Sequence, residues 1–327
     1  MRICIFGAGA VGGFLGARLT QAAAHTGDEI SLVARGAHLQ AMQAHGLQLR
    51  SGGQSHRIDV RATDDPAALG PQDHVIVTLK AHAAPAAAES LRPLLGPDTA
   101  VTFAVNGLPW WYFHALPGPL QGRGLETVDP GGLIARVVGF ERALGCVVYT
   151  GAEVTAPGEI HHGRGETFLL GEPDDSASDR VTALSAALTA AGLDAPVRPD
   201  IRADVWGKLW GNLSFNPVSA LTGETLGGMT RHEGALAVAR AMMAEAETIA
   251  AHLGVAMPMS LDARIEETAR MGEHKTSMLQ DLEKGRSLEI GPVVQAIEEL
   301  GALTGLPTPT IAIVRGLLEL RAKTAAR

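Results

Sequence analysis

The glycines Gly7, Gly9 and Gly12 form the pattern G-x-G-x-x-G directly after the apolar run RICIF and at the start of a helical pattern. Glycines in that setting let a phosphate approach the backbone, and the free N–H groups of a helix N-terminus attract anions. A tight turn without a ligand is the alternative. Because the turn follows a strand and opens a helix, we expect a dinucleotide-phosphate site at Gly7, Ala8, Gly9, Ala10, Val11 and Gly12.

Two cations follow strand-like runs. Arg35 ends EISLVAR, where a nucleotide-binding fold often carries an acid that accepts hydrogen bonds from a ribose 2'-hydroxyl. An arginine instead offers a planar charged fork to a 2'-phosphate, so we expect NADP(H), with help from Gly36 and His38. A solvated loop arginine is the alternative. Lys80 ends HVIVTLK, where we expect it either to contact the cofactor phosphates or only to cap the strand.

A lysine and two asparagines recur every fourth residue in DVWGKLWGNLSFNP, at Lys208, Asn212 and Asn216. On an α-helix they share one face with a drift of about 40° per step. Tryptophan and leucine cover the rest of the cylinder, so we expect this helix to be largely buried. Buried polar groups need partners, and either a polar cavity or ordinary hydrogen bonds between helices would supply them.

The stretch KTSMLQDLEKGRSLEIGPVV contains Ser277, Asp281 and Glu289. Pro292 suits the first turn of a following helix, which would leave Glu289 near that N-terminus. An ordinary N-terminal acid is one interpretation. Beside Lys208, however, Glu289 and Ser277 offer groups that a polar substrate could use.

The elements that must position these residues alternate along the first half of the chain. We expect strands at residues 2–9, 29–35, 74–80 and 100–107, and helices at 10–24, 37–49 with a trailing extended piece, and 84–95. This alternation predicts a parallel sheet with helices on both faces. Residues 144–170 read as a hairpin added to the sheet edge, and the pattern from Asp179 onward is almost wholly helical.

These patterns predict an α/β protein in two parts. We expect an N-terminal Rossmann-type dinucleotide-binding domain at residues 1–198 and an all-helical domain at 199–327 that binds substrate and offers dimer surfaces. A length of 327 residues with 46% hydrophobic content suffices for two domains.

Composition excludes several classes of partner. The net charge of -8, without a basic block, offers little to nucleic acid or to an anionic membrane. Two distant cysteines, Cys4 and Cys146, match neither a disulfide framework nor a metal cluster. With no apolar signal segment in the sequence, we expect a soluble cytoplasmic protein that acts on a small molecule.

Taken together, these stretches resemble the ketopantoate reductase (2-dehydropantoate 2-reductase) family over most of the chain. The matching features are GAGAVGG, Arg35, TLK with Lys80, Asn106-Gly107, the helical lysine and asparagines, and KTSMLQD followed by Glu289 in LEIG. The lysine–asparagine face and SMLQD with its distal glutamate are the most specific of them. The resemblance implies NADPH-dependent reduction of ketopantoate to pantoate in pantothenate biosynthesis.

The resemblance also implies roles for single residues. Lys208 matches the general acid, Glu289 the residue that holds a substrate hydroxyl, and Ser277 a substrate-binding serine. Asn212 and Asn216 are implied to line the active-site cleft, as is Asn106, which we group with the cofactor-binding residues.

Some positions depart from the family pattern. Val105 stands where a glutamine is common, Asn106 is followed by the bulky LPWWYF, and Glu289 is followed by Ile290-Gly291-Pro292. We expect Trp110 and Trp111 to form a packing plug or an oligomer contact, or else to reshape the pocket. The alternatives are therefore a paralogue that reduces another 2-oxo acid and, in another class, a non-catalytic NADP(H)-binding sensor.

Overall fold

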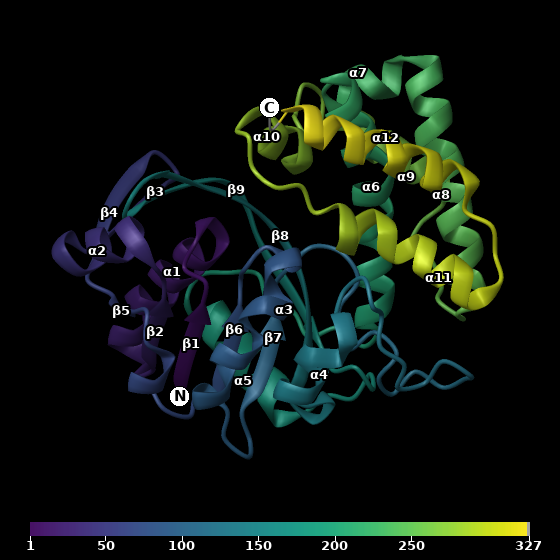
Figure 1. Cartoon of the computed structure of the whole chain (residues 1–327). Coiled ribbons are helices and arrows are strands. Elements are labelled where there is room, and N and C mark those ends of the chain that lie inside the picture. Colours follow the sequence, from purple (N-terminus) through teal and green to yellow (C-terminus); the bar gives the residue numbers. More distant parts are fainter. Residues whose placement is uncertain (326–327) are drawn as a thin grey trace. The chain divides into compact units, whose positions relative to one another are not determined.

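The computed structural model describes residues 1–325, which divide into two compact units (Figure 1). The first unit holds residues 1–105, 109–124 and 129–201. The second holds 106–108, 125–128 and the chain from Arg202 onward. Two short segments of the N-terminal half thus belong to the second unit, and the main change of unit follows Ile201, where we expected a boundary after residue 198.

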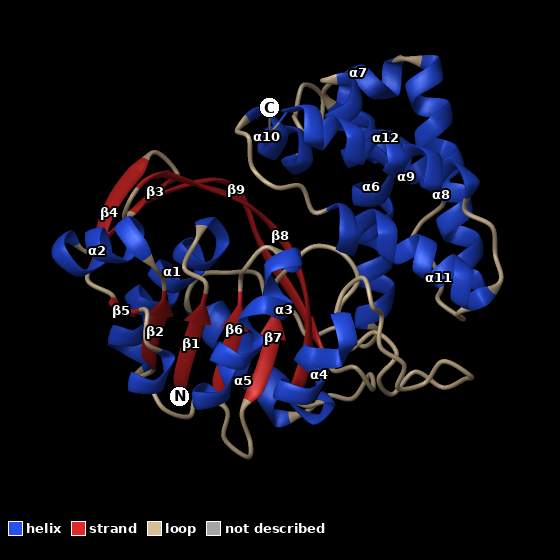
Figure 2. Cartoon of the chain, viewed as in Figure 1, coloured by secondary structure: helices blue, strands red, loops and turns tan. Residues whose placement is uncertain are grey.

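Among residues 1–325, nine strands form one mixed sheet in the order β4-β3-β9-β8-β7-β6-β1-β2-β5. The strands are β1 (Arg2–Phe6), β2 (Glu29–Val33), β3 (Leu47–Ser51), β4 (Gln54–Ile58), β5 (Arg61–Thr63), β6 (His74–Val77), β7 (Ala100–Phe103), β8 (Ala143–Ala156) and β9 (Glu159–Gly171). All neighbours from β8 to β5 in this order are parallel, whereas β9 is antiparallel to β8 and β4 to β3. The β-strands stand out in red in Figure 2.

Helices cover both faces of the central strands, as predicted. Every residue of β6 and β7 and all but the first of β1 are buried, and consecutive side chains of a strand point to opposite faces. The helices of this unit are α1 (Ala10–Thr26), α2 (Gly36–His45), α3 (Ala84–Ala87), α4 (Leu133–Val138) and α5 (Asp179–Ala190). Short 3-10 turns join them: η1 (Pro66–Ala68), η2 (Ala81–Ala83), η3 (Ala88–Leu94), η4 (Pro130–Gly132) and η5 (Phe140–Arg142).

Several local predictions need correction. The hairpin β8–β9 exists, but it is not the sheet edge, because β3 and β4 pair beyond it. The expected helix at 84–95 is mostly the 3-10 turn η3, which contains Pro93, a residue that cannot donate a helical hydrogen bond. Strands β4 and β5 were not expected.

The second unit consists of helices in the described residues. They are α6 (Ile201–Thr222), which begins at the last residue of the first unit, α7 (Leu226–Arg231), α8 (Glu233–His252), α9 (Leu261–Arg270), α10 (Ser277–Glu283), the π-helical turn η6 (Gly291–Gln295), α11 (Ala296–Thr304) and α12 (Pro309–Ala325). Helix α6 is buried nearly all round, as predicted: Trp206 and Trp210 are fully buried, and Trp210 Nε1 donates to the Met243 carbonyl at 2.8 Å. Among residues 1–325, no helix has the length and apolar character needed to cross a membrane.

Trp110 and Trp111 are packing residues of the first unit. Both are at most 2% exposed. The Trp110 ring stacks on Phe140 with centroids 5.3 Å apart and meets Phe103 edge-on at 5.9 Å. Of the roles expected for Trp110 and Trp111, their burial favours packing in the core, because buried aromatic rings stabilise a core.

Candidate active site

Hydrogen bonds fix the glycine turn between β1 and α1. The N–H groups of Gly7 and Ala8 both donate to the Val33 carbonyl at the end of β2, at 3.0 and 2.9 Å. The Gly7 carbonyl accepts from Gly9 N–H and from Thr78 Oγ1, both at 2.7 Å. Gly7 has φ +105°, a conformation that glycine adopts readily and other residues avoid. The turn is therefore held by the ends of β2 and β6.

The space around two of its glycines differs. A Cβ at Gly12 would overlap Thr78 Oγ1 and the Gly7 carbonyl, so this position is closed by the protein itself. A Cβ at the exposed Gly9 would meet no protein atom nearer than 4.0 Å. Helix α1 has no side-chain cap and no acidic residue in its first turn, so its N–H groups suit an anion. The open space at Gly9 and this helix N-terminus fit a dinucleotide pyrophosphate.

Arg35 and Lys80 both lie beyond the carboxyl ends of strands that flank β1. Strand β2 ends at Val33, two residues earlier than predicted, and exposed Arg35 is the extended residue before α2. The Val33 carbonyl also accepts hydrogen bonds from the glycine turn, so Arg35 is only two residues along the chain from that contact. Exposed Lys80 comes three residues after the end of β6 and precedes η2.

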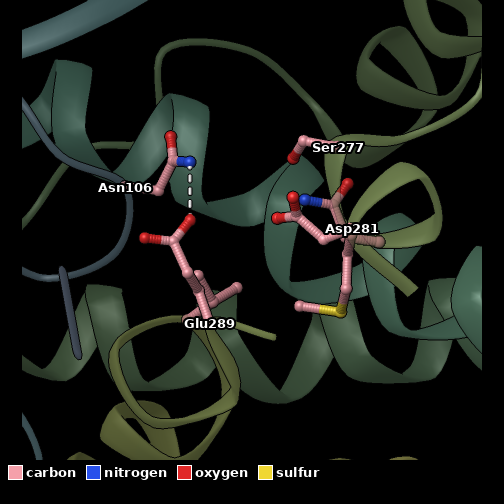
Figure 3. Close-up of a pocket in the computed structure, with 7 residues that line it drawn as sticks. Asn106, Ser277, Asp281 and Glu289 are labelled. Atoms are coloured by element: carbon pink, nitrogen blue, oxygen red, sulfur yellow. Dashed lines mark hydrogen bonds between the residues drawn. The ribbon is translucent and has the colours of Figure 1, made fainter. Parts of the chain in front are cut away.

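The second unit contains a polar pocket of about 220 Å³, including solvent at its mouth (Figure 3). Its lining residues are Asn106, Asn216, Ser277, Met278, Asp281, Glu289 and Val293. Four of these were predicted site residues, separated in sequence by up to 183 positions. In the view of Figure 3, Asn106 and Glu289 point toward one another, and Ser277 and Asp281 lie together apart from that pair.

The segment 106–108 reaches the pocket through two contacts. Asn106 Nδ2 donates to Glu289 Oε2 at 3.0 Å, and Leu108 N–H donates to the Pro292 carbonyl at 3.1 Å. Gly107 between them has φ +91°, and a Cβ there would overlap the Pro292 carbonyl. Glycine is therefore required for this close approach of two backbones.

Glu289 stands directly before a helical segment that opens with Ile290 and the π-helical turn η6. Pro292 lies in that first turn, as predicted, but the π geometry was not expected. Such turns are rare and often occur at functional sites. Glu289 is only 7% exposed, so its carboxylate depends on partners such as Asn106.

Ser277 and Asp281 come from the same short helix. Ser277 is the first residue of α10, whose N-terminus is capped by Thr276 Oγ1, which accepts from Leu279 N–H at 3.2 Å. Asp281 lies one turn later, is 7% exposed, and its carboxylate is 4.0 Å from Arg286 Nη1. Asp281 is not among the predicted site residues, although its spacing of four from Ser277 places both on one face.

Helix α6 carries Lys208, Asn212 and Asn216, as predicted. Of these, only Asn216 lines the pocket. Lys208 and Asn212 are half-buried on the same helix, with Lys208 two turns before Asn216, or about 12 Å along the axis. The structure thus brings together Asn106, Asn216, Ser277 and Glu289, and leaves Lys208 and Asn212 outside the pocket lining.

The chemistry of the pocket lining is that of a hydrogen-bonding site. Its amides and hydroxyl can donate to a carboxylate or a carbonyl, and its two carboxylates can accept from hydroxyl groups. A small ligand with both an acidic and a hydroxyl end would satisfy this set. The Glu289 and Asp281 carboxylates would repel an anionic group placed beside them.

Two family descriptions match the chain. Residues 3–110 match "Ketopantoate reductase PanE/ApbA", and residues 200–322 match "Ketopantoate reductase PanE/ApbA C terminal". A curated 2-dehydropantoate 2-reductase of Mesorhizobium japonicum is 52% identical over 318 residues, which cover 97% of each chain.

Solved structures agree with these matches. One from Ralstonia solanacearum MolK2, provisionally described as a ketopantoate reductase, is 47% identical, covers 99% of this chain and 98% of its own, and has a TM-score of 0.93. A D-mandelate dehydrogenase solved with NADH and anilino(oxo)acetate covers 100% of both chains with a TM-score of 0.85 at 21% identity. At that identity the likeness concerns the fold alone.

Proposed function

Because the chain belongs to the ketopantoate reductase family, we propose that it reduces 2-dehydropantoate (ketopantoate) to pantoate with NADPH, as a step of pantothenate biosynthesis in the cytoplasm. The observation that carries the proposal is the 52% identity to the Mesorhizobium enzyme over 97% of both chains. The chain is an oxidoreductase of a dinucleotide-dependent family, and its substrate class is a small 2-oxo acid.

The proposed reaction needs a proton donor. NADPH supplies the hydride that reaches the carbonyl carbon, and negative charge then grows on the carbonyl oxygen. We assign the donor role to Lys208, because an ammonium both stabilises that charge and can deliver the proton. Its position on α6, in series with Asn212 and Asn216, supports this assignment.

The pocket supports the binding roles. Asn106 donates to Glu289 and so orients the carboxylate, which we assign to accept a hydrogen bond from a substrate hydroxyl. Ser277 and Asn216 can donate to a carbonyl or hydroxyl oxygen of the substrate. The contact with Glu289 also favours a role for Asn106 in the substrate site rather than with the cofactor.

For the cofactor, the glycine turn is the proposed pyrophosphate site and Arg35 the proposed partner of the 2'-phosphate. The exposure of Arg35 just beyond β2 supports the choice of NADPH over NADH. Lys80, beyond β6, is proposed to contact the cofactor phosphates.

The test is a comparison of substrates and cofactors. Purified protein is mixed with NADPH or NADH and with ketopantoate or a panel of 2-oxo acids of different size and hydroxylation, and loss of reduced cofactor is followed by absorbance. We expect the highest kcat/KM for ketopantoate with NADPH. A higher value for another 2-oxo acid would support a paralogous reductase, which the residues Ile290-Gly291-Pro292 after Glu289 favour. Tight NADPH binding without turnover on any substrate would indicate a sensor.

We also propose that the protein forms a homodimer through α12. Ile313, Leu317 and Leu320 are 65%, 52% and 60% exposed and lie four and three residues apart, so they make one apolar stripe on that helix. Light scattering should give the mass of a dimer, and Leu317→Glu should give a monomer. A monomeric wild-type protein would contradict this.

A further inference from the structure

His38 on α2 makes two hydrogen bonds that define its protonation. Gly158 N–H donates to His38 Nδ1 at 2.9 Å, and His38 Nε2 lies 2.8 Å from the Ala8 carbonyl oxygen. Because a backbone N–H can only donate, Nδ1 must be the unprotonated nitrogen, and the ring proton is on Nε2, which donates to Ala8. Only the neutral imidazole satisfies both partners. Burial lowers the pKa of His38 below its usual value, which favours this form.

The acceptor of this bond belongs to the glycine turn. Both polar groups of the peptide that joins Ala8 and Gly9 are hydrogen-bonded: the Ala8 carbonyl accepts from His38, and the Gly9 N–H donates to the Gly7 carbonyl. A rotation of this peptide would free a carbonyl oxygen next to the open space at Gly9. The partial negative charge of such an oxygen would repel a phosphate.

The N–H group that donates to His38 Nδ1 belongs to Gly158, at the tip of the β8–β9 hairpin, and packing holds this tip in place. Gly158 has φ +77°, and a Cβ there would stand 2.9 Å from Ala41 Cβ on α2. Farther along β9, the Ile160 side chain fills the space beside Gly13, and His162 stacks on Phe14 at 4.0 Å. The hairpin therefore lies on α1 and α2 and gives the imidazole a rigid support.

We propose that His38 is a positioning residue of the dinucleotide site: its neutral ring links the hairpin tip at Gly158 to the Ala8–Gly9 peptide and holds the glycine turn in the form that accepts a pyrophosphate. This inference rests on the proposed function, because it requires that the turn binds a dinucleotide. His38 acts through the peptide and not on the substrate.

The test compares three variants by NADPH titration and steady-state kinetics. His38→Leu removes both hydrogen bonds and should raise the Kd and KM for NADPH about three- to tenfold, with kcat at saturating NADPH and the KM for the 2-oxo acid unchanged. His38→Gln can still donate to Ala8 O and should recover most of the affinity. It also keeps the test usable where His38→Leu does not fold.

The matched control is Ser51→Ala. Ser51 Oγ bonds His162 Nδ1 at 2.8 Å, so its loss weakens the attachment of the same hairpin without touching the glycine turn. We expect it to lower the melting temperature and leave the Kd for NADPH unchanged.

The outcomes separate this inference from the proposed function. A wild-type protein that binds no NADPH would refute the function itself. If the wild-type protein binds NADPH and turns over, but His38→Leu changes the Kd less than about twofold, or Ser51→Ala weakens binding equally, His38 is only a structural bridge.

Discussion

Lys208 is the one ammonium that the sequence places on the same helical face as two amides, and the proposed chemistry leaves an alkoxide that must be protonated. Lys208→Ala should lower kcat by about 10²- to 10⁴-fold, the usual contribution of a positioned general acid. Lys208→Arg should not restore the rate, because a guanidinium is a poor proton donor. NADPH titration should be unchanged, since the glycine turn and Arg35 are in the other unit. More than about a tenth of the wild-type rate in Lys208→Ala would move this role to another residue, with Lys80 next to be tested.

Glu289 is buried and accepts a hydrogen bond from the Asn106 amide, so the protein orients its carboxylate. Glu289→Ala should raise the KM for a hydroxylated 2-oxo acid about ten- to a hundredfold, as expected for loss of a charge-assisted hydrogen bond. The KM for an analogue without the hydroxyl should change much less. Equal losses for both substrates would show that Glu289 does not bind the hydroxyl.

Arg35 decides the choice of cofactor in the proposed function. Arg35→Ala should weaken NADPH binding tenfold or more and leave NADH binding almost unchanged, because only NADPH carries the 2'-phosphate. Arg61→Ala is the matched control: Arg61 is an exposed arginine on the neighbouring strand β5, paired with Ser31 rather than with the end of β2. Fluorescence titration measures both affinities. Equal affinity of the wild-type protein for the two cofactors would contradict the role of Arg35.

At the scale of the elements, the strand–turn–helix of residues 2–26 gives a test that separates folding from binding. Gly12→Ala forces a Cβ into Thr78 Oγ1 and the Gly7 carbonyl, so we expect a loss of stability of about 1–3 kcal/mol or more. Gly9→Ala fills only open space and should leave the melting temperature nearly unchanged while abolishing NADPH binding. Normal cofactor affinity in Gly9→Ala would show that no pyrophosphate lies there.

The same elements show what the sequence could predict. Strand β1, helix α1 and helix α6 have local apolar patterns, so their existence and the first residues of β1 and α1 could be predicted, whereas β1 ends at Phe6 and α1 at Thr26, not at the expected residues 9 and 24. The order of the sheet beyond β8 depends on which distant strand pairs with β9, and no local pattern determines that. The 3-10 turn η3 and the π-helical turn η6 each contain a proline, Pro93 and Pro292, and apolar periodicity does not predict the geometry of either turn.

The site residues also divide into those that a local sequence pattern predicts and those that depend on contacts between distant segments. The polar face of α6 was predicted because its members are four residues apart. The contact of Asn106 with Glu289 joins residues 183 positions apart, and that of His38 with Gly158 joins residues 120 apart. Such pairs depend on the tertiary fold. Sequence reasoning therefore identified Asn106 and His38 but assigned them other partners.

At the scale of the whole molecule, each unit contains part of the proposed chemistry. The glycine turn, Arg35 and His38 are in the first unit, while Lys208 and the pocket are in the second. Two of the four tryptophans, Trp110 and Trp111, are buried in the first unit, and the other two are buried in the second. Tryptophan fluorescence thus reports the unfolding of both units.

His74, the first residue of β6, should make the stability of the protein depend on pH. It is 3% exposed, its Nδ1 has no hydrogen-bond partner among the described residues, and burial lowers its pKa from 6.5 to about 4. Between about pH 6.5 and pH 4, His74 is protonated in the unfolded chain but not in the folded chain. The free energy of unfolding therefore decreases as the pH falls through this range. The full loss is about 3 kcal/mol in the free energy of unfolding.

Urea unfolding between pH 7 and pH 4, followed by fluorescence, measures this loss. His74→Gln should remove that part of the pH dependence, whatever its effect on stability at pH 7, because glutamine does not titrate. His25→Gln, at an exposed histidine near the end of α1, should keep the wild-type slope. The neutral ring of His38 adds a loss of the same sign, which both variants retain, so their difference isolates His74. Equal slopes in the wild-type protein and His74→Gln would mean that the folded protein accommodates the protonated ring and that β6 does not set the acid limit of this fold.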